Sequence, residues 1–437
     1  MLTPPAEQAV AALIADLQRV RAGLPHHGSR PPHEQARHLS DEVAAGGLAP
    51  LVHDLLDASD PAPVTTARLD LTQSDSRARL ASYELWRGEA RERITELWEW
   101  VTRRRQAAGA APWWSVGMGL PPVAESLRRL ADVSEPITCL APLARRWAAT
   151  AGLAGGTAEH DWRWLMLGNG LPQARAEARD LPTLDHLLRR LVQRLRVHDL
   201  LPTSHTVRLL RRPNSPSMVL PVQVPGDSLL SLPTEVSPAT VQYLQHELAH
   251  LAEHALRPPD AQLAERWRFD PVRSEGWALL MEYVVRSPDS LRQLGLTPRA
   301  AVDLSRFLHQ EEAFSRGMMA VDVALDARLG TLRTPRELLA EAARLLARTG
   351  LGWAPELVAL RLTRIVHWRA YLAGYAFRDA ALGLLTRRFG AGWSADARAW
   401  LALRTALAAT GSASDFLATL GGRGSPEDRA HSSYTSP

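Results

Sequence analysis

The sequence predicts a mainly α-helical protein with a small β-hairpin or edge sheet that precedes a histidine-rich helix. Three observations lead to this fold class. Large apolar residues recur three and four positions apart over most of the 437 residues, as they do in amphipathic helices. Proline and glycine separate these stretches, as expected at turns. One proline-rich stretch, residues 201–234, instead has short β-branched and apolar runs, which suit short strands.

The N-terminal region, residues 1–150, is expected to be helical. Residues 1–23 resemble an amphipathic helix more than a secretion signal, because Asp16 interrupts the apolar run and no basic leader is present. Helical periodicity continues through residues 81–106 and 121–150. A weak domain boundary is expected near residues 149–161, although this stretch is also consistent with a loop inside one continuous domain.

The region from 151 to 420 carries most of the remaining helical pattern. Helices are expected at residues 180–199, 236–256, 272–286, 299–330, 335–349 and 354–388. Residues 421–437 have no apolar anchors, so a disordered tail is expected there.

Composition limits the classes of partner. All 51 basic residues are arginine, and 47 acidic residues nearly balance them to leave a net charge of +4. The run Arg103-Arg104-Arg105 is interpreted as a solvated helical face, because no nucleic-acid-binding motif accompanies it. The single Cys139 excludes an internal disulfide and a thiolate metal cluster. No apolar stretch approaches the ~20 residues of a membrane span. A cytoplasmic protein with no nucleic-acid or membrane partner is expected, and its oligomeric state is not determined.

Residues 245–254, QHELAHLAEH, hold three histidines and the pattern His246-Glu247-Leu248-Ala249-His250, which matches H-E-x-x-H. Residues four apart on an α-helix point to one face, so both imidazoles can bind one ion. Glu247 lies beside that ion without binding it. This arrangement predicts a zinc site that carries its own general base.

A catalytic zinc site needs a third protein ligand. Glu275, at the start of the next amphipathic stretch, SEGWALLMEYVV, can supply it if that helix runs antiparallel to the first. The alternative is His254, but it lies eight residues from His246, about 12 Å of helix rise, and is rotated about 80° from it. Glu275 is therefore the preferred third ligand.

HELAH followed by SEGWALLMEYV resembles a bacterial family of metallopeptidases, filed as a domain of unknown function, in which a zincin helix precedes a Glu-Gly-Trp-Ala helix. Glu275-Gly276-Trp277-Ala278 and Glu282 match that signature, and the resemblance covers roughly residues 215–390. Two features depart from the family. The H-E-x-x-H motif is uninterrupted here, whereas the family usually inserts Pro-Gly between the glutamate and the second histidine. Asp326 stands where the family tends to have histidine. The implied fold is a helical gluzincin-like metallopeptidase.

The predicted roles follow from zinc on His246, His250 and Glu275. Glu247 is expected to be the general base, which takes a proton from water and passes it to the leaving amine. His367, Tyr371, Tyr375 and Arg378 form one polar stripe, on which Tyr371, followed by Gly374 as in the family's Tyr-x-x-Gly pattern, is the candidate oxyanion donor. The other interpretation is that these tyrosines only pack. Arg378 is expected either to bind a substrate carboxylate or to pair with Asp379 or another neighbour.

Three acidic residues near this stretch are expected to act through other side chains. Gluzincins often place an aspartate four residues after the glutamate ligand, but Leu279 stands there, so another residue must orient the histidine. Glu282 is too far along its helix for the same ion and is expected to bond a ligand histidine. Asp322 and Asp326 orient that histidine or pair with Arg316, with a structural salt bridge preferred.

The sequence therefore favours a zinc-dependent peptidase acting on peptides, more on short ones than on folded proteins. One alternative is a zinc hydrolase of a non-peptide amide in specialised metabolism. Another is a metal-free helical interaction protein in which HELAH occurs by chance.

Overall fold

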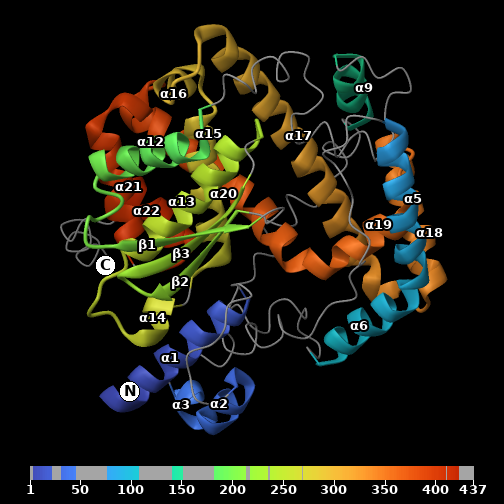
Figure 1. Cartoon of the computed structure of the whole chain (residues 1–437), viewed down its shortest axis with the longest axis horizontal. Coiled ribbons are helices and arrows are strands. Elements are labelled where there is room, and N and C mark those ends of the chain that lie inside the picture. The colour runs from blue at the N-terminus through green and yellow to red at the C-terminus, as the bar shows by residue number, and fades with distance from the viewer. Residues whose placement is uncertain are drawn as a thin grey trace, which may run out of the picture.

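The computed structural model describes residues 3–21, 31–45, 76–107, 140–150, 182–212, 217–234, 237–267, 269–409 and 411–422. These residues form a predominantly helical protein with one small sheet, which confirms the predicted fold class (Figure 1). None of the described helices combines the length and the apolar character needed to cross a bilayer. The tail beyond residue 422 and residues 151–181, which include most of the expected domain boundary, lie outside the described residues.

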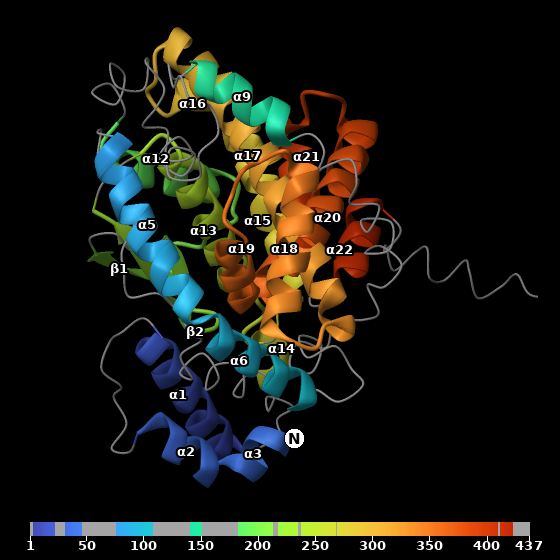
Figure 2. The ribbon, with the colours of Figure 1, turned by 90° about the vertical axis from the view of Figure 1, so that its right-hand side faces the viewer.

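The described part of residues 1–150 is helical, as predicted. Its helices are α1 (Pro4–Arg21), α2 (Pro32–His38), α3 (Ser40–Ala45), α5 (Ser76–Glu92), α6 (Ile94–Ala107) and α9 (Leu140–Thr150). They pack in two places. The first three share a small core with Val224, Leu263 and Trp267. The next two join the main hydrophobic core, and Figure 2 shows them running beside α18 (Pro335–Thr349) and α19 (Pro355–Leu360).

The remaining elements follow the predicted order. After α12 (Leu184–Val197) come β1 (Thr206–Arg212), β2 (Met218–Gln223) and β3 (Asp227–Pro233). The helices that follow are α13 (Thr240–Ala255), α14 (Leu263–Trp267), α15 (Pro271–Val285), α16 (Pro288–Gln293), α17 (Pro298–Arg328), α20 (Ile365–Phe389), α21 (Ala397–Ala408) and α22 (Ala413–Leu420), besides α18 and α19.

Four of these helices begin with the same local signal. A side-chain oxygen at the N-cap accepts a hydrogen bond from a backbone N–H of the first turn, and proline follows at the first helical position. Proline is tolerated there because its missing N–H would have had no partner inside the helix. The four pairs are Asp270-Pro271, Ser287-Pro288, Thr297-Pro298 and Thr334-Pro335.

The helix predicted at residues 354–388 is interrupted. It is divided into α19, the 3₁₀ turn η2 (Arg361–Arg364) and α20. In an unbroken helix the carbonyl of Arg361 would accept the N–H of residue 365. Here the indole N–H of Trp368 donates to that carbonyl at 3.3 Å, and the Arg361 guanidinium bonds Asp322. These side-chain contacts stabilise the break, and periodicity alone does not reveal them.

The sheet forms in the stretch predicted to hold strands. Its order is β1-β3-β2, with β1 parallel and β2 antiparallel to β3. The predicted hairpin is β2–β3, which turns through Gly226 at φ +135°, a conformation that favours glycine. Figure 1 shows the sheet on one side of α13, while α15 packs against α13 and α20 packs against α15. The histidine-rich segment of α13 therefore lies between the sheet and α15, and α20 packs on α15.

Candidate metal centre

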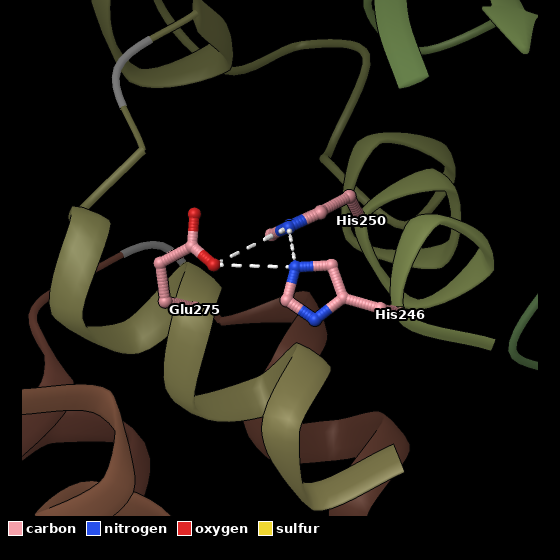
Figure 3. A group of neighbouring side chains, drawn as sticks. All are labelled: His246, His250 and Glu275. Atoms are coloured by element: carbon pink, nitrogen blue, oxygen red, sulfur yellow. Dashed lines mark hydrogen bonds and ion pairs between the residues drawn. The ribbon is translucent and has the colours of Figure 1, made fainter. Parts of the chain in front are cut away.

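The two histidines of the H-E-x-x-H motif lie on α13 and point toward α15 (Figure 3). Their ring nitrogens approach each other, with His246 Nε2 and His250 Nε2 3.1 Å apart. The ring planes are almost perpendicular, at 78°. The four-residue spacing therefore brings the two Nε2 atoms close together, as predicted.

Glu275 completes the cluster from α15. Its Oε2 lies 3.3 Å from His246 Nε2 and 3.8 Å from His250 Nε2 (Figure 3). In the described part of the chain, these three side chains are the one group of three His, Cys, Asp or Glu residues whose ligand atoms all lie within 4.8 Å of one another. Glu275, and not His254, thus occupies the third position.

The helix that carries Glu275 is antiparallel to α13, as predicted. Ser274 lies near His250, whereas Glu282, eight residues later, lies near His246, so the two helices run in opposite directions. The fully buried Trp277 fixes this packing by donating its indole N–H to the Ala249 carbonyl at 2.9 Å. The tryptophan of the Glu-Gly-Trp-Ala segment thereby connects the two ligand helices.

The nitrogen of each histidine that faces away from the cluster, Nδ1, is called the outer nitrogen. It has a different partner in the two residues. His246 Nδ1 is 2.8 Å from Glu282 Oε1, so Glu282 bonds a histidine of the motif, as expected from the sequence. A metal ligand must be a neutral imidazole, and in neutral His246 the proton lies on Nδ1, because the carboxylate of Glu282 only accepts; Nε2 then directs its lone pair toward the cluster. His250 Nδ1 is 3.0 Å from Ser274 Oγ, a partner that the sequence interpretation missed. Such bonds orient ligand histidines in metal sites.

Two carboxylates give the cluster a negative character. Burial alone would lower the pKa of His246, but its hydrogen bonds to Glu275 and Glu282 outweigh burial and raise that pKa well above the usual value. Burial lowers the pKa of His250, although Glu275 opposes this shift. Burial also opposes ionisation of Glu282, but Arg286 and His246 lower its pKa. The position between the three ligand atoms therefore favours a positive charge.

Two glycines bring α15 and α20 into close contact beside Glu275. A Cβ added to Gly374 would lie 2.9 Å from the backbone nitrogen of Gly276 and 3.2 Å from the Cβ of Glu275. A Cβ added to Gly276 would lie 2.2 Å from Cδ1 of Phe377. These separations leave no room for a side chain, which is why glycine stands at both positions. The crossing sets the position of Glu275 against Tyr371, one turn before Gly374.

Glu247, the glutamate of the motif, is hydrogen-bonded to the sheet. Its Oε2 accepts the backbone N–H of Val219 in β2 at 2.7 Å. Burial raises the pKa of Glu247 to about 7, although the charge of His246 and the Val219 hydrogen bond act in the opposite direction. The backbone of β2 thus holds the carboxylate of the motif's glutamate.

Tyr371 lies directly against the cluster. Its hydroxyl is 2.9 Å from His246 Nε2, and its ring stacks on the His246 ring at 5.4 Å with an interplanar angle of 4°. When His246 is neutral with its proton on Nδ1, the phenol O–H donates to Nε2. Burial and the nearby carboxylates, Glu275 first, raise the pKa of Tyr371 well above its usual value. The phenol therefore keeps its proton at neutral pH.

Tyr375 and Arg378, further along the polar stripe on α20, contact other partners. Tyr375 is buried, and Arg378 and Arg316 lie over its ring. Arg378 bonds Asp379 and Glu312, so the neighbour-pairing interpretation is the one observed. The side chain of His367 lies outside the described residues.

The remaining acidic candidates form structural ion pairs, as preferred from the sequence, but with other partners than Arg316. Asp322 pairs with Arg361 at 2.8 Å, and Asp326 pairs with Arg369. Arg316 instead lies 3.6 Å from Asp379. His254 packs against Phe269, with ring centroids 4.8 Å apart, and takes no part in the cluster.

No family model and no curated protein matches the chain. The family resemblance described from the sequence therefore stays a prediction. Similar solved structures include the M32 carboxypeptidase from Deinococcus radiodurans R1, with a TM-score of 0.47 and 13% identity over 98% of this chain and 97% of that one. The carboxypeptidase of Pyrococcus furiosus has a TM-score of 0.44 and 13% identity over 97% and 99%.

Metallocarboxypeptidase 1 of Trypanosoma cruzi is similar too, with a TM-score of 0.43 and 12% identity over 98% of each chain. The chain thus aligns along almost its whole length with metallocarboxypeptidases. The TM-scores are below 0.5 and the identities far below 25%, so the function argued below depends on the residues of this chain.

Proposed function

We propose that this chain is a zinc-dependent peptidase that hydrolyses peptide bonds, with short peptides as substrates. The observation that carries the proposal is the convergence of His246 Nε2, His250 Nε2 and Glu275 Oε2, with both outer histidine nitrogens held by partners. A helical interaction protein with an accidental HELAH segment would have no need for this arrangement.

The donor set fits zinc. Zinc bonds of about 2.0–2.2 Å at tetrahedral angles place ligand atoms roughly 3.3–3.6 Å apart. The separations here are 3.1, 3.3 and 3.8 Å, close to that range without any rearrangement of the helices. Two imidazoles and one carboxylate also suit other first-row divalent ions, so the metal has to be identified by measurement.

A zinc ion held by these ligands supplies Lewis-acid activation of water and of a substrate carbonyl. The remaining chemistry belongs to the protein. Glu247 accepts the proton of the attacking water and delivers it to the amine nitrogen of the leaving group. A pKa of about 7 suits this exchange at neutral pH, and the Val219 N–H holds one carboxylate oxygen so that the other is left for the proton.

Tyr371 is the proposed oxyanion donor. Its protonated hydroxyl lies beside the three ligand atoms, where it can donate a hydrogen bond to the carbonyl oxygen of a substrate as negative charge develops. Tyr375 is the alternative on the same helix, but it is buried beneath two arginines.

A peptide substrate is favoured over another amide by the position of β2. This strand pairs with β3 alone in the described sheet, and the N–H of Val219 points away from β3 to the base. The carbonyl of Val219 therefore also faces away from β3, and an extended peptide can add to such an edge. The ligand side chains are at most 15% exposed, which favours short or extended chains over folded proteins.

The proposal is tested by metal content and by hydrolysis together. Purified protein is expected to hold about one zinc per chain, measured over all first-row metals by mass spectrometry, and Glu275→Ala to lose it. Glu247→Gln should keep the metal and lose hydrolysis of a mixed peptide library by roughly 10²–10⁴-fold. Tyr371→Phe should lose about 10²–10³-fold, with Tyr283→Phe, an exposed tyrosine on α15, as its control.

Each rival function has its own outcome. A wild-type chain that never holds metal leaves only the interaction protein. A chain that holds zinc but cleaves no peptide in the library supports a hydrolase of a non-peptide amide.

A further inference from the structure

A chain of buried polar side chains continues behind the ligand His246. Glu282 bonds His246 with Oε1, and its second oxygen, Oε2, is bonded by Arg286, which lies one turn later at the C-cap of α15. Arg286 then reaches two other helices, through Gln242 on α13 and Glu312 on α17. Three ligand-bearing or neighbouring helices therefore meet at one guanidinium.

Each nitrogen of that guanidinium has a different partner. NH2 bonds Glu282, Nε donates to Gln242 Oε1 at 2.9 Å, and NH1 pairs with Glu312. Arg286 and Gln242 are each only 1% exposed. A planar guanidinium that is hydrogen-bonded through Nε and NH2, ion-paired at NH1 and buried has one orientation, and it transmits that orientation to the carboxylate it holds.

The partners of Arg286 are fixed in turn. Gln242 donates to Glu311 Oε2 at 2.6 Å, and Glu311 also accepts from Ser315 at 2.8 Å. Because Glu311 accepts through both oxygens, the amide of Gln242 must present its oxygen to Arg286. The orientation of Arg286 is thus determined from the side opposite the metal cluster.

Removal of Arg286 would leave Glu282 as a buried carboxylate with only the His246 N–H as its partner among these contacts. A buried carboxylate that loses its cationic partner is strongly destabilised and tends to move or to take up a proton. Either change would loosen the imidazole that it orients. We propose that Arg286 is a positioning residue for the metal centre, which holds His246 in its ligand geometry through Glu282. This inference rests on the proposed metal site.

The chain offers a matched control in Arg378. This arginine is also buried and also pairs with Glu312, but its other partner is Asp379 and not Glu282. Loss of Arg378 removes a buried guanidinium, whose charge also lowers the pKa of Glu282, from the same network, but it removes no hydrogen bond from the carboxylate behind His246. A purely structural network would respond similarly to both losses.

The experiment measures the zinc dissociation constant by competition with a chromophoric chelator, with folding checked by circular dichroism. Arg286→Met is expected to weaken zinc binding by about 10–100-fold, the range typical for partners behind metal ligands. Arg286→Lys, which keeps the charge, should recover part of that loss. Arg378→Met should stay within about threefold of wild type.

A double-mutant cycle separates positioning from general destabilisation. If Arg286 acts through Glu282, then Arg286→Met should add less than about twofold to the loss already caused by Glu282→Ala. If Arg286→Met does not fold, Arg286→Gln replaces it under the same limits.

Zinc affinity unchanged in Arg286→Met, or an undiminished loss in the Glu282→Ala background, would overturn the inference. A wild-type protein that binds no zinc would instead defeat the proposed function, so the two failures are distinguishable.

Discussion

His250 and His254 lie one turn apart on the same helix, yet their surroundings are opposite. His250 bonds Ser274 through Nδ1 and faces His246 and Glu275 through Nε2. His254 packs against Phe269, and among the described residues nothing bonds its Nδ1. Residue type, helix and depth are similar, so the difference comes from the segment packed on α13. On this comparison, His250 can serve as a ligand because that segment supplies both Glu275 and a partner for Nδ1.

The difference between His250 and His254 is tested most directly by removing each histidine in turn. A zinc site with four ligands binds with roughly 10–16 kcal/mol, or about 2.5–4 kcal/mol per ligand, so His250→Ala should weaken zinc binding by roughly 100–1,000-fold. His254→Ala should leave zinc affinity within about threefold of wild type. Chelator competition measures both. Equal losses in the two variants would mean that His254 is a ligand.

The partners of the outer nitrogens provide a second test. Glu282 is a charged partner of His246, whereas Ser274 is a neutral partner of His250. Because bonds to charged groups are stronger, Glu282→Ala should weaken zinc binding by about 10–100-fold and Ser274→Ala by only several-fold. The same competition measurement applies. The reverse order would show that the charge of Glu282 is not what orients the site.

The contact between α15 and α20 provides a third test, because it positions Glu275 and not the two histidines of the cluster. Gly374→Ala places a Cβ against the backbone of Gly276 and should lower the free energy of unfolding by about 1–3 kcal/mol, together with zinc affinity. Gly383→Ala, on the same helix, meets only the flexible end of Arg387 at 3.3 Å. That control should be neutral or slightly stabilising. Urea unfolding of the two variants checks the difference, and equal stability would show that the crossing is not tight.

The smallest expected effect concerns His254 itself. Burial, with the nearby charges of His250, His205 and Arg257, lowers the pKa of His254 well below its usual value. The unfolded chain therefore binds a proton below about pH 6.5 that the folded chain does not, so stability falls as the pH falls.

Replacing His254 with leucine should remove this contribution, at most about 1.4 kcal/mol per pH unit below 6.5. Urea unfolding with a chelator present, at pH 7.5 and 5.5, measures it. Equal pH dependence in the two proteins would show that His254 titrates normally.

The elements that the sequence predicted correctly are those set by local rules. Helical periodicity located α13, α15 and α17, and the proline-rich stretch located the three strands. The continuous helix expected at 354–388 was wrong, because the Trp368 indole and the Asp322 carboxylate stabilise a break at Arg361. Those partners are close only after folding.

The sequence by itself determined that His246 and His250 share a helical face with Glu247 beside them, because that relation follows from the helix period alone. Glu275 was already the preferred third ligand, but only the tertiary structure decided how close it comes. The tertiary structure also decided the close crossing at Gly276 and Gly374, the Val219 N–H on Glu247, and the guanidinium of Arg286 behind Glu282. Each of these contacts joins separate elements, so it depends on packing that no local pattern in the chain expresses.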